Sequence, residues 1–348
     1  MKIQEEVSLA PLTSFGVGGP AEKLVTIEDS TDIKSALEGA DADKPLWRLG
    51  YGTNVLISDK GLPGTTILFR NKNLKLEDEL VIADAGLWWD DLVQFSISKN
   101  LWGLELMSGI PGSVGAGVFI NITAYGQSLA ERLVWIETID KETRQLSRLN
   151  AHDFEWRYKQ TVFQSSHRDH LIVRAAFDLK PGVTTELTYQ SALDVAKKIQ
   201  ADTTTLSGRR LTIMEAREQA GSLFSFKPDD AKTVGSFFRN PKVTRKQAEI
   251  VTGFDETGKN KEQIARMNAV HGGDSLRVSA AHVLLAAGFQ RGQSWGPVRL
   301  HPKNLLKIEN TGGASASQIY DVAKHIIDTV RDKLSIELQA EAQLLGEF

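Results

Sequence analysis

The sequence contains no cysteine, which excludes disulfide bonds, thiolate metal sites and a cysteine nucleophile. No apolar run approaches the roughly 20 residues that a membrane-spanning helix needs, and the N-terminal MKIQEEVSLA lacks the apolar core of a secretory signal. The 44 acidic and 41 basic residues are mixed along the chain without a basic block, so nucleic acid is not expected as a partner. These absences favour a cytoplasmic protein without membrane insertion.

The composition is that of an ordinary globular protein, with 41% hydrophobic and 24% charged residues in a chain of 348. That length predicts two or three domains. Strand and helix patterns alternate through the first hundred residues, which favours an α/β or α+β domain. Farther on, residues 133–139 and 145–149 predict a hairpin, 317–334 a helix with one apolar stripe, and 336–344 a final strand.

Residues 110–126, which read IPGSVGAGVFINITAYG, form the most distinctive stretch of the chain. Gly112, Gly115 and Gly117 follow Pro111, and glycine lets a ligand approach the main chain closely. Successive amide N–H groups in such a loop form an anion-binding concavity, and a pyrophosphate is its natural ligand. The alternative interpretation is a tight turn between two packed elements.

Four separated motifs resemble those of the UDP-N-acetylenolpyruvoylglucosamine reductase family: residues 50–56 (GYGTNVL), 110–126, 234–241 (VGSFFRNP) and 338–341 (LQAE). The Phe-Phe form of the third motif looks like the first type of the family. The resemblance covers nearly the whole chain. It implies an α+β protein with a two-lobed FAD-binding fold of the vanillyl-alcohol-oxidase (PCMH) type and a C-terminal α+β substrate-binding domain. The implied domains are 1–206, with lobes of about 1–70 and 71–206, and 207–348.

The resemblance further implies non-covalent FAD, NADPH as the reductant, and a nucleotide-sugar substrate. The implied reaction converts UDP-N-acetylglucosamine enolpyruvate to UDP-N-acetylmuramate in peptidoglycan biosynthesis, and we expect a monomer. Both glycine loops would hold the flavin pyrophosphate. The implied FAD-binding residues are Gly50, Tyr51, Gly52, Thr53, Asn54, Val55, Leu56, Pro111, Gly112, Ser113, Val114, Gly115, Asn121, Ala124 and Tyr125.

Such a reduction needs a proton donor at one carbon and a cation or hydrogen-bond donors at the carboxylate, where negative charge grows. Ser236 matches the family's proton donor; alternatively, Gly-Ser only forms a turn before two core phenylalanines. Glu341 matches the catalytic glutamate, although the usual Glu-Pro-Glu is Gln339-Ala340-Glu341 here. The alternative interpretation is that Glu341 is only a solvated carboxylate at a sheet edge.

The third catalytic position departs from the family pattern, because Lys159 stands where an arginine is expected. Lysine keeps the charge but loses the planar fork that binds a carboxylate through two bonds. A shifted alignment places Trp156-Arg157 there instead, at the cost of a gap before Phe163. The implied substrate-binding residues are Tyr158, Tyr189 and Asn240.

Two further departures leave other functions open. Ala220 occupies a region where many relatives carry a lysine that binds the diphosphate, and residues 251–276 contain no tyrosine. A flavoenzyme for another substrate, or a flavin-binding protein without catalysis, are therefore the competing hypotheses. His167 and His170 form an H-x-x-H pair without further ligands nearby, so we expect one helical turn of surface histidines and no metal.

Overall fold

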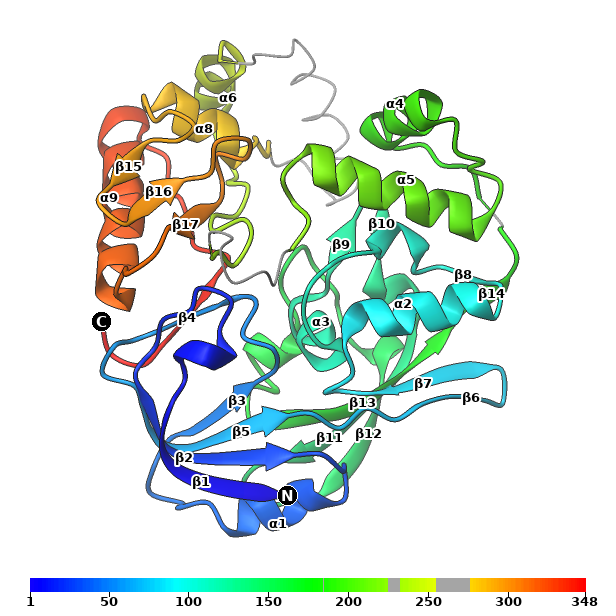
Figure 1. Ribbon diagram of the computed structural model, residues 1–348. Helices are drawn as coiled ribbons and strands as arrows, with labels where there is room; N and C mark the ends of the chain where they lie inside the picture. Colours follow the sequence, from blue (N-terminus) through cyan, green and yellow to red (C-terminus); the bar gives the residue numbers. More distant parts are fainter. Residues whose placement is uncertain (184, 225–231, 255–275) are drawn as a thin grey trace. The chain divides into compact units, whose positions relative to one another are not determined.

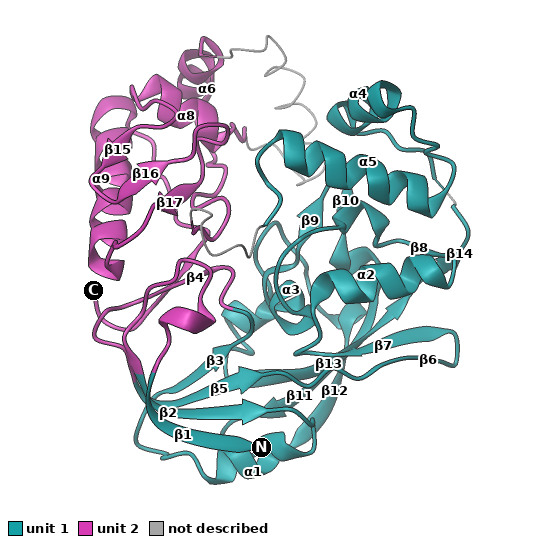
Figure 2. Ribbon diagram, viewed as in Figure 1, with its two compact units in different colours: residues 1–7, 21–51, 63–224 teal, residues 8–20, 52–62, 225–348 magenta. Residues whose placement is uncertain are grey.

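The computed structural model describes residues 1–183, 185–224, 232–254 and 276–348. The chain divides into two compact units (Figure 2). Unit 1 comprises Met1–Val7, Ala21–Tyr51 and Pro63–Phe224; unit 2 comprises Ser8–Pro20, Gly52–Leu62 and Ser225–Phe348. These units divide at Phe224, whereas the sequence led us to divide the chain at 206. The assignment of 1–206 to FAD and 207–348 to substrate stays a prediction.

Two sheets form the frame of unit 1 (Figure 1). The first has the order β1-β2-β5-β3, with β3 parallel to β5. The second is antiparallel, has the order β12-β11-β13-β7-β6, and contains the predicted hairpin, in which Ile139 lies opposite Leu146. The strands are β1 (Lys2–Ser8), β2 (Pro20–Ile27), β3 (Leu46–Leu49), β5 (Leu62–Phe69), β6 (Leu74–Glu77), β7 (Leu80–Asp84), β11 (Leu133–Asp140), β12 (Leu146–Asn150) and β13 (His170–Asp178).

The helices of unit 1 are α1 (Asp32–Glu38), α2 (Trp89–Ser98), α3 (Val114–Ile120), α4 (Gln190–Ile199) and α5 (Leu206–Gln219). Short strand pairs join β8 (Leu101–Trp102) to β14 (Lys180–Pro181) and β9 (Thr123–Ala124) to β10 (Gln127–Ser128). Apolar side chains from both sheets and from α1 to α3 share one core. His167 lies in a turn and His170 in β13, so the prediction of a helical turn was wrong: the extended, apolar residues after His170 pair with β11 instead.

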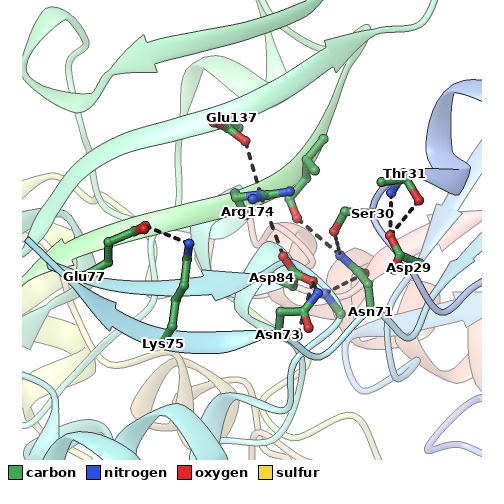
Figure 3. A network of polar contacts seen from close by, with 12 residues as sticks. Asp29, Ser30, Thr31, Asn71, Asn73, Lys75, Glu77, Asp84, Glu137 and Arg174 are labelled. Atoms are coloured by element: carbon green, nitrogen blue, oxygen red, sulfur yellow. Dashed lines mark hydrogen bonds and ion pairs between the residues drawn. The ribbon is translucent and has the colours of Figure 1, made fainter.

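A buried polar network fixes the segment that follows β7 (Figure 3). Asp84 accepts from the Asn73 side chain at 2.9 Å and lies 3.8 Å from Arg174 Nε. The Asn71 amide donates to Ser30 Oγ at 2.9 Å and accepts from Gly86 N at 3.2 Å. Because Asn71 and Asp84 are almost fully buried, each needs these partners. The network therefore sets the position of residues 84–89, which hold the glycine loop described below.

Unit 2 contains the three-stranded antiparallel sheet β15-β16-β17 and the parallel pair β4-β18. Its elements are β4 (Val55–Ile57), α6 (Arg245–Thr252), α8 (Ala280–Ala286), β15 (Ser294–Trp295), β16 (Val298–Leu300), β17 (Ile308–Asn310), α9 (Ala316–Leu334) and β18 (Gln343–Leu345). The predicted helix at 317–334 is confirmed as α9, which buries Ile319, Val322, Ile326 and Val330. Ser315 opens α9 with a capping box.

The predicted final strand was too long. Only Gln343–Leu345 pairs regularly, with β4. Upstream, Ala340 forms one isolated bridge with Phe238, flanked by single hydrogen bonds from Arg239 N to Gln339 O and from Glu341 N to Phe237 O. Burial still alternates upstream, because Ile336 and Leu338 are buried whereas Glu337 and Gln339 are exposed. Among the described helices, none is both long enough and apolar enough to cross a bilayer.

Candidate functional site

The glycine loop in unit 1 is held by residues 85–89. Val114 N donates to Leu87 O and Gly115 N donates to Ala85 O, each at 2.9 Å, while Trp89 N donates to Gly112 O at 2.8 Å. The amides of Val114 and Gly115 are thus used within the protein. Those of Gly112 and the adjoining Ser113 have no acceptor among the described residues.

Gly50 approaches this loop closely. A Cβ atom on Gly50 would lie 2.7 Å from Ser113 Oγ, and one on Gly115 would lie 2.8 Å from Ala85 Cβ. Within the part of the chain that the structure describes, the Tyr51 amide, next to Gly50, also has no acceptor. Amides without an acceptor around a space that only glycine leaves open are the donor set of a phosphate-binding cradle, so these residues fit the diphosphate of FAD.

Tyr51 is fixed by an aromatic and cationic stack. Its ring meets that of Trp88 edge-on with centroids 4.8 Å apart, and the Arg70 guanidinium carbon lies 4.3 Å from its centroid. Arg70 Nη1 also donates to Gly50 O at 2.9 Å. Burial raises the pKa of Tyr51, so its hydroxyl stays protonated at neutral pH. Sequence reasoning missed Arg70, although a single basic residue directly after a buried strand was a usable signal.

Asn121 links the glycine loop to the position of the expected arginine. It ends α3 with φ 50° and donates through Nδ2 to Arg157 O at 3.2 Å. Its Oδ1 accepts from Ser128 Oγ and Ala130 N, at 3.1 and 3.3 Å. The side chain of Asn121 therefore holds the protein's own segments together.

Lys159 lies at the tip of a tight turn. Arg157 and Gln160 exchange two backbone hydrogen bonds of 3.1 and 3.2 Å, which leaves Tyr158 and Lys159 between them. Lys159 has φ 55°, an uncommon conformation for a residue with a side chain. Both Tyr158 and Lys159 are half-buried.

Arg157, the alternative to Lys159, is already paired. It donates through Nε and Nη2 to both carboxylate oxygens of Glu155 at 2.7 Å, and its side chain is 65% exposed. An exposed guanidinium with a carboxylate partner has little capacity for a second carboxylate. The assignment of Lys159 rather than Arg157 as the substrate cation stays a prediction.

Tyr125 and Tyr189 lie against each other, with ring centroids 5.2 Å apart in an edge-on arrangement. Tyr125 and Gly126 form the turn between β9, which ends at Ala124, and β10; their φ angles of 48° and 87° are both positive, as a two-residue hairpin turn of type I′ requires. An aromatic residue in this conformation is a genuine outlier. Burial raises the pKa of Tyr125.

The segment after Gly235 forms the centre of the predicted site in unit 2. Ser236 pairs with Lys307 in an antiparallel bridge, and Glu341 N donates to Phe237 O at 2.7 Å. Asn54 Nδ2 in turn donates to Glu341 O at 3.3 Å. The structure thus brings Ser236, Glu341 and Asn54 onto adjoining segments.

The rest of the predicted loop continues from this point. The amides of Gly52 and Thr53 have no acceptor among the described residues, and Val55 and Leu56 pair with β18. Asn240 accepts from Ala280 N at 2.9 Å through Oδ1, at the start of α8. At least part of the Asn240 side chain therefore serves the fold.

The fold and these loops are those of a two-domain FAD-dependent oxidoreductase. Residues 21–147 match the model of an FAD binding domain, and residues 227–345 match that of the UDP-N-acetylenolpyruvoylglucosamine reductase C-terminal domain. Within that class, the chain belongs to the UDP-N-acetylenolpyruvoylglucosamine reductase family.

Relatives match along nearly their whole length. The UDP-N-acetylenolpyruvoylglucosamine reductase of Mycobacterium tuberculosis H37Rv is 30% identical over 359 residues, covering 99% of this chain and 95% of the relative. That of Streptomyces avermitilis is 29% identical over 345 residues, covering 98% and 94%. The crystal structure of the Thermus caldophilus enzyme (MurB) superposes with a TM-score of 0.68 at 21% identity and covers 99% of this chain and 100% of that one. This likeness shows the two-domain α+β fold.

Proposed function

We propose that this protein reduces UDP-N-acetylglucosamine enolpyruvate to UDP-N-acetylmuramate, with NADPH as the reductant and FAD as the carrier, in peptidoglycan biosynthesis. The observation that carries the proposal is the bonding of the Ser236 segment to Glu341, within a chain that belongs to this family along 99% of its length. We further propose that it acts as a cytoplasmic monomer.

The proposed chemistry assigns separate tasks to the chain's own residues. Bound FAD supplies a hydride to the enolpyruvyl double bond. Ser236 provides the proton for the carbon next to the one that receives the hydride, and Glu341 is the catalytic carboxyl group that assists this proton transfer. Lys159 binds the substrate carboxylate, where charge grows in the transition state. Tyr158, Tyr189 and Asn240 are the proposed contacts to the remainder of the substrate.

The amide groups around Gly50 and Ser113 support the cofactor assignment, because they offer donors to a diphosphate. The half-buried position of Lys159 and the exposed Arg157–Glu155 pair support Lys159 as the substrate cation. A cation beside the carboxylate stabilises the enolate-like transition state even without the bidentate geometry of arginine.

The test is anaerobic and follows the flavin spectrum. The purified flavoprotein is photoreduced and mixed with UDP-N-acetylglucosamine enolpyruvate, and the expected result is rapid return of the oxidised spectrum. Ser236→Ala should abolish this return and leave reduction by NADPH intact. Ser98→Ala, an exposed serine in α2, is the matched control.

Failure of the wild-type protein to be reoxidised, with FAD bound, would overturn the proposal. Reoxidation by a different enol ether or nucleotide sugar would then identify a diverged flavoenzyme. Reoxidation by none of them would indicate a flavin-binding protein without this catalysis.

A further inference from the structure

The three-stranded sheet of unit 2 has one apolar face and one charged face. Val298, Leu300 and Ile308 are fully buried in the core, where they pack with residues of α9. Because side chains alternate along a strand, Arg299 and Glu309 project from the opposite face. They are cross-strand partners, and Arg299 Nε lies 2.7 Å from Glu309 Oε2.

Ser236 and Lys307 belong to this charged face. Phe237 and Ile308 are buried in the core. Because side chains alternate along a strand, the preceding residues, Ser236 and Lys307, are directed away from the core. Ser236 lies directly opposite Lys307, and Phe237 N donates to Leu306 O at 2.8 Å beside them. Directly opposite residues of an antiparallel pair have Cβ atoms about 4.5–5.5 Å apart on one face. The four-carbon stem of lysine spans such a distance.

Lys307 is a buried charge, with only 5% of its surface exposed. Burying an ammonium group is costly unless nearby charges compensate it. Lys307 thus brings a positive charge into a site that water barely reaches.

The surrounding charges form a defined cluster on the same face. His301 Nδ1 accepts from Lys303 N and Asn304 N at 2.9 and 3.0 Å, so the ring proton lies on Nε2, which is 3.8 Å from Glu309 Oε1. Burial lowers the pKa of His301, and the charge of Lys307 acts in the same direction. The neutral form of His301 is thus favoured even though Glu309 acts in the opposite direction, and buried Glu309 is the anion that pairs with Arg299.

We propose that Lys307 is a positioning residue for the proton donor, acting through Ser236; this inference rests on the proposed function. When the Ser236 O–H bond breaks, its proton forms the new C–H bond with the electron pair of the enolate, and an alkoxide remains. The ammonium stabilises that alkoxide and returns a proton to Oγ; the lysine amine then regains a proton from water. The electrons come from NADPH through the flavin, so the cycle closes without a further reactant.

The requirement follows from the weakness of serine as an acid. A serine hydroxyl does not release a proton readily at neutral pH unless positive charge or donors stabilise the oxyanion that forms. Among groups with that role, removing one donor typically slows the chemical step by about 10²–10³-fold. Lys307 lies opposite the hydroxyl that needs such help.

The test compares Lys307→Met with Lys307→Arg and with Lys303→Met, which removes the same charge from an exposed position of the same segment. In the photoreduced holoenzyme, Lys307→Met should slow reoxidation by the enolpyruvate about 10²–10³-fold. It should leave KM and NADPH reduction unchanged and enlarge the solvent deuterium isotope effect. Lys307→Arg should retain most of the rate, and Lys303→Met should match the wild type.

The pH profile separates this role from a structural one. In the wild type, reoxidation should fall at high pH as the ammonium loses its proton, and this limb should be absent in Lys307→Met. If that variant does not fold, Lys307→Gln gives the same comparison. If the variant without the charge reoxidises at the wild-type rate and keeps the fall in rate at high pH, the inference is overturned. Equal losses in flavin reduction by NADPH and in reoxidation by the enolpyruvate would overturn it as well. Failure of the wild-type protein to be reoxidised would instead overturn the proposed function.

Discussion

Replacing Gly50 by alanine tests the close approach between the two glycine loops. The added Cβ would lie 2.7 Å from Ser113 Oγ and 3.5 Å from Ser113 Cβ. Only the first distance is too short, so the Ser113 hydroxyl must rotate away. That hydroxyl caps α3 by accepting from Ala116 N at 3.2 Å. Loss of such a cap costs about 0.5–2 kcal/mol.

We therefore expect Gly50→Ala to lower the free energy of unfolding by about 1 kcal/mol, measured by urea titration of the apoprotein. FAD affinity should weaken as well, because the displaced hydroxyl adjoins the amides of Gly112 and Ser113. Gly39→Ala is the matched control, since its Cβ would meet nothing nearer than Ser35 O, at an ordinary 3.5 Å, and its φ is −85°.

A double-mutant cycle makes the reasoning refutable. In a Ser113→Ala background the cap is already absent and only the ordinary 3.5 Å contact remains, so Gly50→Ala should cost almost nothing there. An equal cost in both backgrounds, or a Gly50→Ala protein as stable as Gly39→Ala, would show that the contact with Ser113 is not the cause.

Three further predictions concern other parts of unit 1. Arg209→Met should lower the free energy of unfolding, measured by urea titration, by about 3–5 kcal/mol, because it leaves the fully buried Glu105 without its cation. The double variant that also carries Glu105→Gln should recover much of this loss. Burial lowers the pKa of His167, so the free energy of unfolding should fall as pH drops below the ordinary value of about 6.5 and then level off, and this dependence should shrink in His167→Gln. Lys159→Ala should slow flavin reoxidation by the enolpyruvate, whereas Arg157→Ala should not; the reverse result would assign the substrate cation to Arg157.

The sequence predicted what local patterns encode. The hairpin around residues 140–143 and the long helix α9 were found because their apolar periodicity and polar turn are continuous in the chain. The glycine loop was found because Gly112 and Gly115 occupy positions with special backbone or steric demands. The sequence predicts too long a final strand, because residues 336–342 can alternate between buried and exposed without pairing to another strand.

Pairings between distant segments left no local signal. Nothing near Ser236 indicates that Lys307 lies opposite it. The position of Arg70 directly after a buried strand marks it as a candidate, but not that its guanidinium lies over the Tyr51 ring. Such contacts depend on strand register and on which residues follow each strand. The roles of Ser236, Glu341 and Lys159 rest on the family pattern, and the experiments above are their tests.

The pairing of β4 with β18 has a consequence for how this enzyme is made. Asn54 and Glu341 are 287 positions apart, yet their hydrogen bond joins the loop around Asn54 to the Ser236 segment. Contacts of such sequence separation form slowly, and during translation they cannot form before residues 338–345 have left the ribosome. A nascent chain therefore completes this part of the fold only after those residues have emerged.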